Sequence, residues 1–437
     1  MPPLQPAAAR RVFLLLTLTR WFPVGLTVAI LILFQLDRGL SVPQALTASA
    51  LGGGVVLLLE LPTGSFADGF GRRPVYLAAA VVNVAAATVY LLAHEFWAFA
   101  VGACLMGLFR ALDSGPLEAW YVDTVHLTEP GADVDSALSL QSAVLGTAVA
   151  SGALASGALV WWHPISAWSA LTLPMLAFTV LNAVHVVAVL VLMREPVRHG
   201  GVAGVRRAVA SARQAPAVVL EGLALVRHDR VLRGLVLVEV FWSIAMVVFE
   251  QFQPIRLGQL LGDEARAAAW MGPVSAGGWA VFALGAGLAG FCARWLGVAR
   301  TAILARLLNG LGAVGMGLVA GPAALVAAYL VTYAMHGAAG PMHGGLLHRQ
   351  ATAANRATVV SINSMTSSAS FALCAPVLGL LAASTSNQSA MIAAGALSLI
   401  GALCYLPALR DERRPATPLD REPRLGAPPR PRHEGGA

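Results

Sequence analysis

Ionisable side chains cluster in one otherwise apolar stretch, GLFRALDSGPLEAW at residues 107 to 120. Arg110 and Asp113 are three residues apart and can pair on one face of a helix, while Pro116 loosens the helix before Glu118. A carboxylate paired with arginine stays ionised, whereas one released into an apolar cavity takes up a proton. We expect Asp113 to exchange a proton under the influence of Arg110, with Glu118 as a second candidate; the alternative is a static pair that stabilises the packing.

A second apolar stretch, RGLVLVEVFWSIAMVVFEQF at residues 233 to 252, carries two glutamates. Glu239 and Glu250 are eleven residues apart, about three helical turns, so they share a face with Met246 and lie near Ser243. Glu239 is a candidate for contacting a cationic substrate or for carrying a proton. Glu250 is expected at a hydrated helix end near the outer mouth.

Four further charged or polar positions fall inside apolar stretches. His336 and His343 are seven residues apart and share a helix face, but two histidines two turns apart do not chelate one metal ion. The open alternatives for them are proton relay, substrate hydrogen bonding and ordinary interior packing. Arg20 and Glu60 are expected to form a gate pair.

Uncharged side chains could also shape a binding cavity. The aromatic residues that could stack on an apolar substrate, or pack in the core instead, are Trp21, Phe241 and Trp242. The stretch at residues 357 to 381 is rich in serine and threonine, with Ser361, Ser364 and Ser368 at helical spacing. Small polar residues of this kind line hydrated paths or simply let helices pack closely.

These residues must be positioned by membrane-spanning helices. The chain has 437 residues, of which 57% are hydrophobic and 12% charged, whereas soluble domains carry about 25% charged residues. Apolar runs of roughly 20 residues, long enough to cross a bilayer, recur along the chain. Twelve spans are predicted, at residues 12 to 34, 45 to 66, 75 to 92, 96 to 119, 136 to 160, 167 to 192, 233 to 255, 267 to 291, 299 to 320, 322 to 345, 357 to 381 and 388 to 409.

The distribution of arginine predicts the orientation. All 29 basic residues are arginine, and they concentrate in alternate loops, while outward loops hold only Arg38, Arg256 and Arg266. The positive-inside rule then places both termini in the cytoplasm. The protein is expected in the inner (cytoplasmic) membrane of the cell. The net charge of +7 reflects this orientation, so no nucleic-acid partner is expected. The four cysteines are dispersed and are interpreted as packing residues.

The spans divide into two sets of six. Residues 1 to 11 precede the first bundle at 12 to 193, an arginine-rich cytoplasmic linker follows at 194 to 232, and the second bundle occupies 233 to 409. The tail at 410 to 437 is rich in proline and charge and is expected to be disordered. A shift of 226 residues aligns the loop glycines Gly64 and Gly71 with Gly290 and Gly297, which indicates a repeat with a substrate site at the interface.

The stretch ELPTGSFADGFGRRP at residues 60 to 74 brings charge and glycine together in the loop after the second span. Its glycines permit a sharp turn, Asp68 can lie against a helix N-terminus, and Arg72 or Arg73 can pair with Asp123 at the end of the fourth span. Such contacts can form in one arrangement of the bundles and break in another.

The order Gly64, Asp68, Gly71, Arg72, Arg73 resembles the G-x-x-x-D-R/K-x-G-R-R/K loop of the major facilitator superfamily, although Gly69 stands where that family has a basic residue. The resemblance implies an all-α polytopic membrane protein with twelve transmembrane helices in two six-helix bundles. It also implies that this loop stabilises the outward-facing state. The stretches ELPTG, at residues 60 to 64, and SGPLEAWYVD, at residues 114 to 123, are similar to the corresponding motifs in the drug-efflux branch of that superfamily.

We therefore expect a monomeric, proton-coupled secondary carrier that exports small amphipathic or cationic compounds, including antibiotics, across the bilayer. The alternative is a proton-coupled uptake symporter for a small nutrient or metabolite. GTAVASGALASGALVWWHP, on the fifth span, lacks the Gly-Pro pair of the family's antiporters, so the direction of transport stays open. A membrane enzyme or a sensor is a third possibility. No Walker-type loop, cofactor motif or metal cluster is seen, and self-contained ATP-driven transport is excluded.

Overall fold

The computed structural model describes residues 4–63, 66–195, 202–352 and 355–413, and these residues form helices without any strand. The first half of the chain contains α1 (Pro6–Thr27), α2 (Leu31–Asp37), α3 (Val42–Thr63), α4 (Phe66–Phe70), α5 (Arg72–Leu92), α6 (Phe96–Asp113), α7 (Pro116–Thr128), α8 (Asp135–Trp162) and α9 (Thr172–Leu192). We call this set the N-half.

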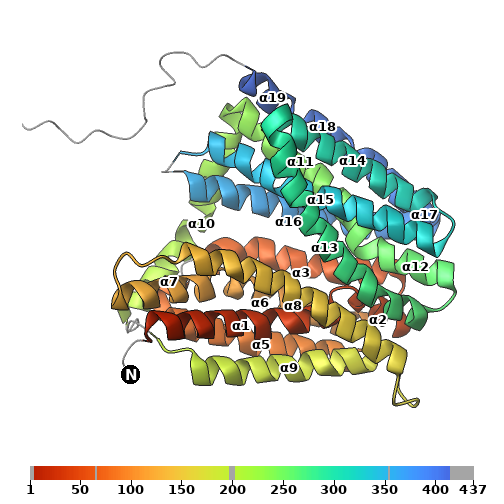
Figure 1. The fold of residues 1–437 in the computed structure, drawn as a ribbon, viewed down its shortest axis with the longest axis horizontal. Helices are drawn as coiled ribbons and strands as arrows, with labels where there is room; N and C mark the ends of the chain where they lie inside the picture. The colour runs from red at the N-terminus through yellow and green to blue at the C-terminus, as the bar shows by residue number, and fades with distance from the viewer. Residues whose placement is uncertain (1–3, 64–65, 196–201, 353–354, 414–437) are drawn as a thin grey trace, which may run out of the picture.

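The second half begins after α10 (Val202–His228). It contains α11 (Arg230–Val247), the π-helical turn η1 (Val248–Phe252), α12 (Gln253–Leu261), α13 (Glu264–Leu296), α14 (Val298–Leu318), α15 (Pro322–Gln350), α16 (Arg356–Ser384), α17 (Asn387–Ser398), α18 (Ile400–Leu403) and α19 (Leu406–Glu412). We call α11 to α19 the C-half. The two halves lie side by side with their long helices running in the same general direction (Figure 1).

The expected all-α membrane fold is confirmed. Eleven helices or continuous helix pairs are long and apolar enough to cross a membrane, and the count in the described chain is twelve when α1 and α2, bent by 42°, form one span. The seventh predicted span is longer than expected, because α11, η1 and α12 together run from Arg230 to Leu261.

The fourth predicted span breaks where the sequence suggested. Gly115 adopts φ +92°, a conformation that glycine reaches without strain, and Pro116 starts α7, where a missing N–H is harmless. The consequence is that Asp113, the last residue of α6, sits at a joint between two helices.

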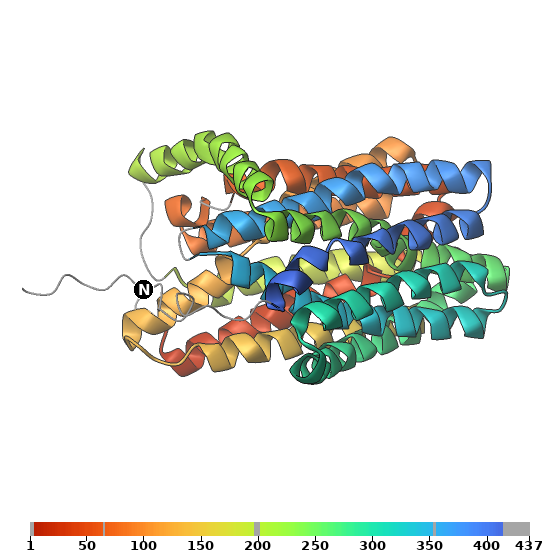
Figure 2. The ribbon, with the colours of Figure 1, turned by 90° about the horizontal axis from the view of Figure 1, so that it is seen from above.

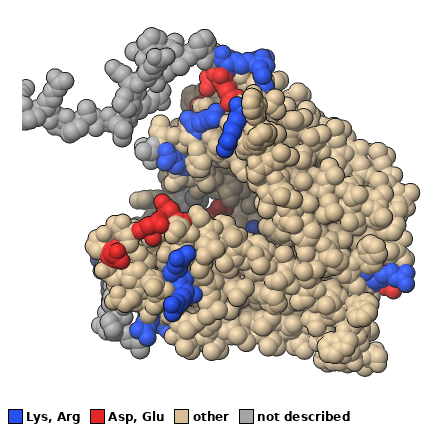
Figure 3. All heavy atoms as spheres, in the orientation of Figure 1, with Lys and Arg blue, Asp and Glu red and all other residues tan. Residues whose placement is uncertain are grey.

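The two ends of the molecule differ in packing. At the end that carries α2 and α12, which we call the far end, one apolar core draws residues from both halves, among them Leu33, Phe99, Phe252 and Leu378. At the opposite end, which carries α7 and α10 and which we call the linker end, each half has its own separate core. The halves are therefore joined at the far end, and the surface is hollowed between them at the linker end (Figure 3).

The joint depends on close helix contacts between α3 and α16 and between α8 and α13. On the second pair, Gly157 and Gly272 face each other so closely that a Cβ on Gly157 would lie 2.9 Å from the Gly272 Cα. Small residues permit such an approach between spanning helices.

The predicted linker includes a regular helix. α10 packs against α3, α4 and the start of α16, so it contacts both halves at the linker end (Figure 2). The predicted tail begins within α19, and its residues 414–437 lie outside the described residues.

Candidate functional site

A cavity near the middle of the molecule lies between the halves. This central cavity has a volume of about 610 Å³, and both halves line it. The N-half contributes Arg110 and Tyr90, and the C-half contributes Glu239, Trp242, Met246 and Glu250. Three serines of α16 and Asn363 add neutral polar groups, so the predicted serine-rich face does border the cavity at Ser364 and Ser368.

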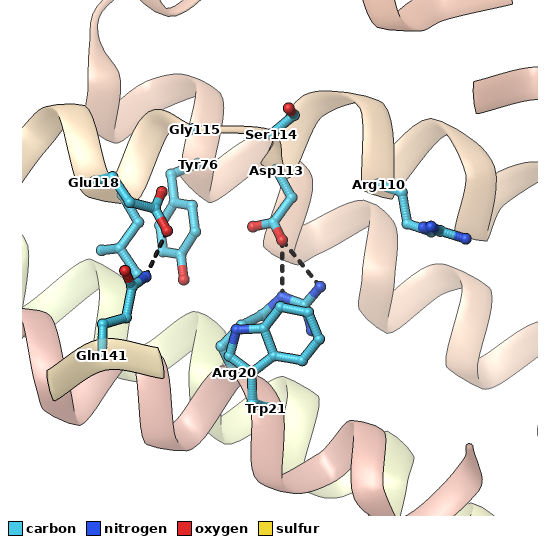
Figure 4. A pocket seen from close by; sticks show the side chains of 10 residues that line it. Arg20, Trp21, Tyr76, Arg110, Asp113, Ser114, Gly115, Glu118 and Gln141 are labelled. Atoms are coloured by element: carbon cyan, nitrogen blue, oxygen red, sulfur yellow. Dashed lines mark hydrogen bonds and ion pairs between the residues drawn. The ribbon is translucent and has the colours of Figure 1, made fainter. Parts of the chain in front are cut away.

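A smaller cavity of about 340 Å³, the N-half cavity, adjoins it on the N-half side (Figure 4). Asp113, Glu118 and Tyr76 line it, and Arg110 lines both cavities. Arg110 lies between the two cavities, because it lines both and its side chain extends away from Asp113 (Figure 4).

Asp113 pairs with Arg20, and the predicted pair with Arg110 is wrong. Arg20 donates from Nη2 at 2.9 Å and from Nε at 3.1 Å to the same Asp113 oxygen, Oδ2. The arginine on α1 is only 5% exposed and needs a carboxylate partner. Its guanidinium also lies over the rings of Trp21 and Phe109, at 4.7 Å and 4.2 Å from the ring centroids.

The predicted gate pair of Arg20 and Glu60 is also wrong, because Arg20 is occupied by Asp113. Glu60 instead accepts hydrogen bonds from Ser364 Oγ at 3.0 and 3.2 Å. These bonds run between α3 and α16, so Glu60 links the two halves through a neutral partner.

Arg110 is not directly paired within the described part of the chain, although the charges of Arg20 and Glu60 act on it at longer range. Within the described part of the chain it forms no hydrogen bond or ion pair, and its side chain is exposed to the hollow between the halves. A cation held in a membrane span without a partner is costly, so such a residue generally marks a functional site. Glu118, the other predicted group nearby, accepts a hydrogen bond from Gln141 of α8 and stays within the N-half cavity.

The C-half contains a second buried pair. Glu239 Oε1 lies 3.1 Å from His343 Nε2, and the two side chains are about equally buried. His343 also contacts Tyr405 Oη at 2.9 Å and Asn363 Oδ1 at 3.1 Å. Glu239 therefore lines the central cavity and is also paired with His343, which Tyr405 and Asn363 contact in turn.

The remaining predicted residues of α11 lie close to this pair. Trp242 donates to His336 Nδ1 at 3.2 Å and stacks on its ring, so this histidine belongs to an aromatic cluster. Ser243 is fully buried and donates to the Ser367 carbonyl at 3.0 Å, which ties α11 to α16. Met246 lines the central cavity.

Glu250 is not at a hydrated helix end, contrary to expectation. The span continues beyond it through η1 into α12, and its carboxylate faces the central cavity. Tyr333 of α15 donates to Glu250 Oε1 at 3.0 Å. The glutamate is therefore an interior group of the seventh span.

One charged residue of the C-half was missed by the sequence analysis. Arg306 of α14 is 6% exposed and its guanidinium lies 5.1 Å from the Trp242 ring centroid. The signal was available, since Arg306 lies inside the apolar stretch at residues 299 to 320, six residues beyond Arg300 at its edge.

The structure describes only part of the loop after α3 that carries the family resemblance. Arg72 Nε donates to Asp123 Oδ2 at 3.2 Å, which confirms this predicted pair. Gly71 precedes α5 with φ +101°, and Arg73 donates from its backbone N to Glu195 at 2.8 Å and from Nη2 to the Leu190 carbonyl at 2.9 Å.

Two residues of the same loop escape description. Gly64 lies outside the described residues, and so does the side chain of Asp68 within α4. The Arg72 pair is present here while the halves are separated at the linker end, so this contact within the N-half does not require the closed arrangement.

Comparisons with known proteins agree on the fold. The sequence model described as Major Facilitator Superfamily matches residues 13–345 and 281–434. A mutant of the nucleoside transporter NupG has a similar structure, with a TM-score of 0.73 and 13% identity over 91% of this chain and 99% of the other.

Two other solved structures give comparable values. A POT family transporter in complex with a thioalcohol conjugated peptide has a TM-score of 0.69 and 16% identity over 93% of this chain and 96% of its own. A structure from the proton dependent oligopeptide transporters has a TM-score of 0.66 and 13% identity over 93% and 99%. No curated protein sequence matches the chain.

Proposed function

Because the chain belongs to the Major Facilitator Superfamily, we propose that this membrane transporter is proton-coupled and carries a small polar solute through the central cavity by alternating access. The arginine-rich loops lie at the linker end, so we assign that end to the cytoplasm. The arrangement described is then open toward the cytoplasm and closed toward the outside.

The solute class follows from the lining of the central cavity. Arg110 of the N-half has no partner in the described chain and faces the same space as Glu239 and Glu250 of the C-half. A solute with an anionic group for Arg110 and a cationic or hydrogen-bonding group for the glutamates would bind both halves at once. A volume of about 610 Å³ lies within the ordinary range of small-molecule sites.

This lining supports uptake of a nutrient or metabolite better than export of amphipathic compounds. The predicted drug-efflux branch rests on loop resemblance alone, whereas the cavity carries charge of both signs and several neutral polar groups. The likeness in fold to a nucleoside transporter and to proton dependent oligopeptide transporters agrees with a polar solute. Export stays the second candidate, because Trp242, Met246 and Phe371 offer apolar surface in the same cavity.

Proton coupling is assigned first to the Arg20 and Asp113 pair. Asp113 ends α6 at the joint with α7, and Arg20 Nη1 has no hydrogen-bond partner in the described chain. A proton on Asp113 would remove the counter-charge of Arg20 and weaken the tie between α1 and the joint. The change in packing at that joint is how protonation would reach the arrangement of the helices.

The test is transport into proteoliposomes that contain a pH-sensitive dye, under an imposed inward proton gradient. Dipeptides, nucleosides and a cationic amphipathic dye serve as probes, with wild type compared with Asp113→Asn. We expect a polar probe to accumulate with protons in wild type, and Asp113→Asn to lose accumulation while still exchanging labelled for unlabelled probe.

Two results would count against the proposal. If only the amphipathic cation moves, and it leaves the vesicle interior in exchange for protons, export is the function. If a polar probe accumulates equally with Asp113→Asn, this carboxylate is not the coupling group.

A further inference from the structure

We propose that Glu250 is a second proton-binding group, served by a one-water site that Gln253, Ser275 and Tyr329 form beside it on the far-end side. This inference rests on the proposed proton coupling and adds a route by which a proton reaches the cavity from outside. It concerns residues that the Arg20 and Asp113 pair does not touch.

Glu250 lies between two cavities. It lines the central cavity, and it also lines a small cavity of about 20 Å³ that we call the far-end cavity. One carboxylate oxygen, Oε1, accepts the hydrogen bond from Tyr333 at 3.0 Å, and the other is free to face either space. A single side chain thus touches both compartments.

The far-end cavity fits one water molecule. A cavity needs roughly 10 to 15 Å³ and two to four polar partners to hold a water. Gln253 most clearly needs a water as a hydrogen-bond partner. Its side chain is 0% exposed, and neither its amide oxygen nor its amide nitrogen has a hydrogen-bond partner in the described chain. Ser275, Tyr329 and Glu250 line the same space and complete the set of polar partners.

The backbone around this cavity is irregular in both halves. Glu250 belongs to the π-helical turn η1, and such turns inside α-helices are frequent at functional sites. Val28 and Ala29, in the break between α1 and α2, line the opposite wall. The first span of each half is therefore interrupted beside the same small cavity.

The apolar core of the far end closes the route in the present arrangement. Leu33, Phe252 and Leu257 are each fully buried in the core that both halves share. Parting of the halves at this end would separate the α1–α2 break from η1 and open the far-end cavity to the outside. Glu250 would then face the outside in one arrangement and the central cavity in the other.

The proton step balances in charge. A proton from outside passes through the water to the free oxygen of Glu250, and the carboxylate changes from −1 to neutral without any other reactant. The titratable groups that face Glu250 from neighbouring helices, or that share a cavity or ring cluster with it, are Tyr329, Tyr333, His336, Tyr90, Arg110 and Glu239. None of them forms an ion pair with Glu250, so its charge is free to change.

The first test needs no substrate. Infrared spectra of the purified full-length protein in lipid, recorded across a pH titration, report the C=O stretch of protonated carboxyl groups. We expect Glu250→Gln to remove one such band from the wild-type spectrum. Glu129→Gln is the control, because it makes the same change at an exposed site outside both cavities, and it should leave that band in place.

The water site is tested by Gln253→Leu, which removes the amide oxygen and nitrogen and leaves a side chain of similar size. Losing one hydrogen bond of ordinary strength to the carboxylate should move the midpoint of the Glu250 band to higher pH by about one unit. An identical set of bands in wild type and Glu250→Gln overturns the proton assignment. An unchanged midpoint in Gln253→Leu overturns the water site.

A transport measurement separates this inference from the proposed function. With a polar probe that wild type accumulates, Glu250→Gln should lower the ratio of proton-driven accumulation to gradient-free probe exchange at least tenfold. Wild type that accumulates no probe refutes the proposed coupling, whereas coupled wild type and equally coupled Glu250→Gln refute the role of Glu250 alone.

Discussion

At the scale of single residues, the two halves hold buried charge in opposite order. The N-half places its cation, Arg20, on the first span and its acid, Asp113, on the fourth. The C-half places its acid, Glu239, on the first span and its partner His343 on the fourth. Each half therefore joins its first and fourth spans through a buried pair, and the acid lies on the fourth span in the N-half and on the first span in the C-half.

The Arg20 and Asp113 pair is expected to hold the N-half together. Arg20→Met leaves a buried carboxylate without its partner, which typically costs about 3 to 5 kcal/mol. Arg72→Met is the matched control, because the Arg72 and Asp123 side chains are 17% and 38% exposed and partly exposed pairs contribute about 0 to 1 kcal/mol. Thermal unfolding in detergent measures both, and equal losses of Tm would contradict the assignment.

Replacing Arg110, unlike replacing Arg20, is expected to affect solute binding and not the stability of the fold. Since it has no partner in the described chain, Arg110→Gln should leave Tm within about 1 °C, consistent with a change below 0.5 kcal/mol. The same variant should raise the KM for an anionic or zwitterionic probe about tenfold or more, because a charged hydrogen bond to the solute is worth about 1.5 to 3 kcal/mol. A large fall in Tm with an unchanged KM would make Arg110 a structural residue.

At the scale of elements, the third span of each half begins in the same way. Gly71 before α5 has φ +101° and Gly297 before α14 has φ +86°, at the shift of 226 residues that the sequence showed. A glutamate from the end of the sixth span of each half accepts backbone N–H groups there: Glu195 from Arg73, and Glu412 from Val298 and Ala299 at 3.1 and 3.0 Å. Carboxylates at helix N-termini are stabilising. In each half, the end of the sixth span is therefore bound to the start of the third span.

Gly297→Ala tests this contact. Gly297 has φ +86° and ψ 159°, a region nearly restricted to glycine that costs a residue with a Cβ about 1 to 3 kcal/mol, and the new Cβ would lie 3.0 Å from Glu412 Oε2. Gly290→Ala is the control, because Gly290 is helical and a Cβ there meets nothing within 4 Å. We expect a lower Tm for Gly297→Ala alone, and a similar Tm for the two variants would show that the turn tolerates a side chain.

The helices could be predicted from the sequence, but several of their interactions could not. The length of an apolar run is a local property, and Gly115 with Pro116 marks a break by its own chemistry. The break between α1 and α2 and the turn η1 depend on packing between the halves, which no local pattern encodes. Asp113 was matched with Arg110 for the same reason, since spacing along one helix cannot reveal that Arg20 lies opposite.

At the scale of the whole molecule, alternating access requires the contacts at the far end to be reversible. The α8 and α13 contact depends on Gly157 and Gly272, whose close approach leaves no room for a side chain. An added methyl group at Gly157 would clash only while the far end is closed, so it should favour the arrangement that is open there. A shift of about 1 kcal/mol would change the ratio of the two arrangements about fivefold.

This shift is measurable by labelling with a membrane-impermeant maleimide. In a background without the four native cysteines, Ser368→Cys places a reporter in the central cavity. When Gly157→Ala is added, labelling from the linker end should become slower and labelling from the far end should become faster. Gly146→Ala on the same helix is the control, because a Cβ there meets nothing within 4 Å, and it should leave both labelling rates unchanged. If Gly157→Ala leaves both rates unchanged while Tm falls, the glycine contact serves stability and the halves separate at the far end by another route.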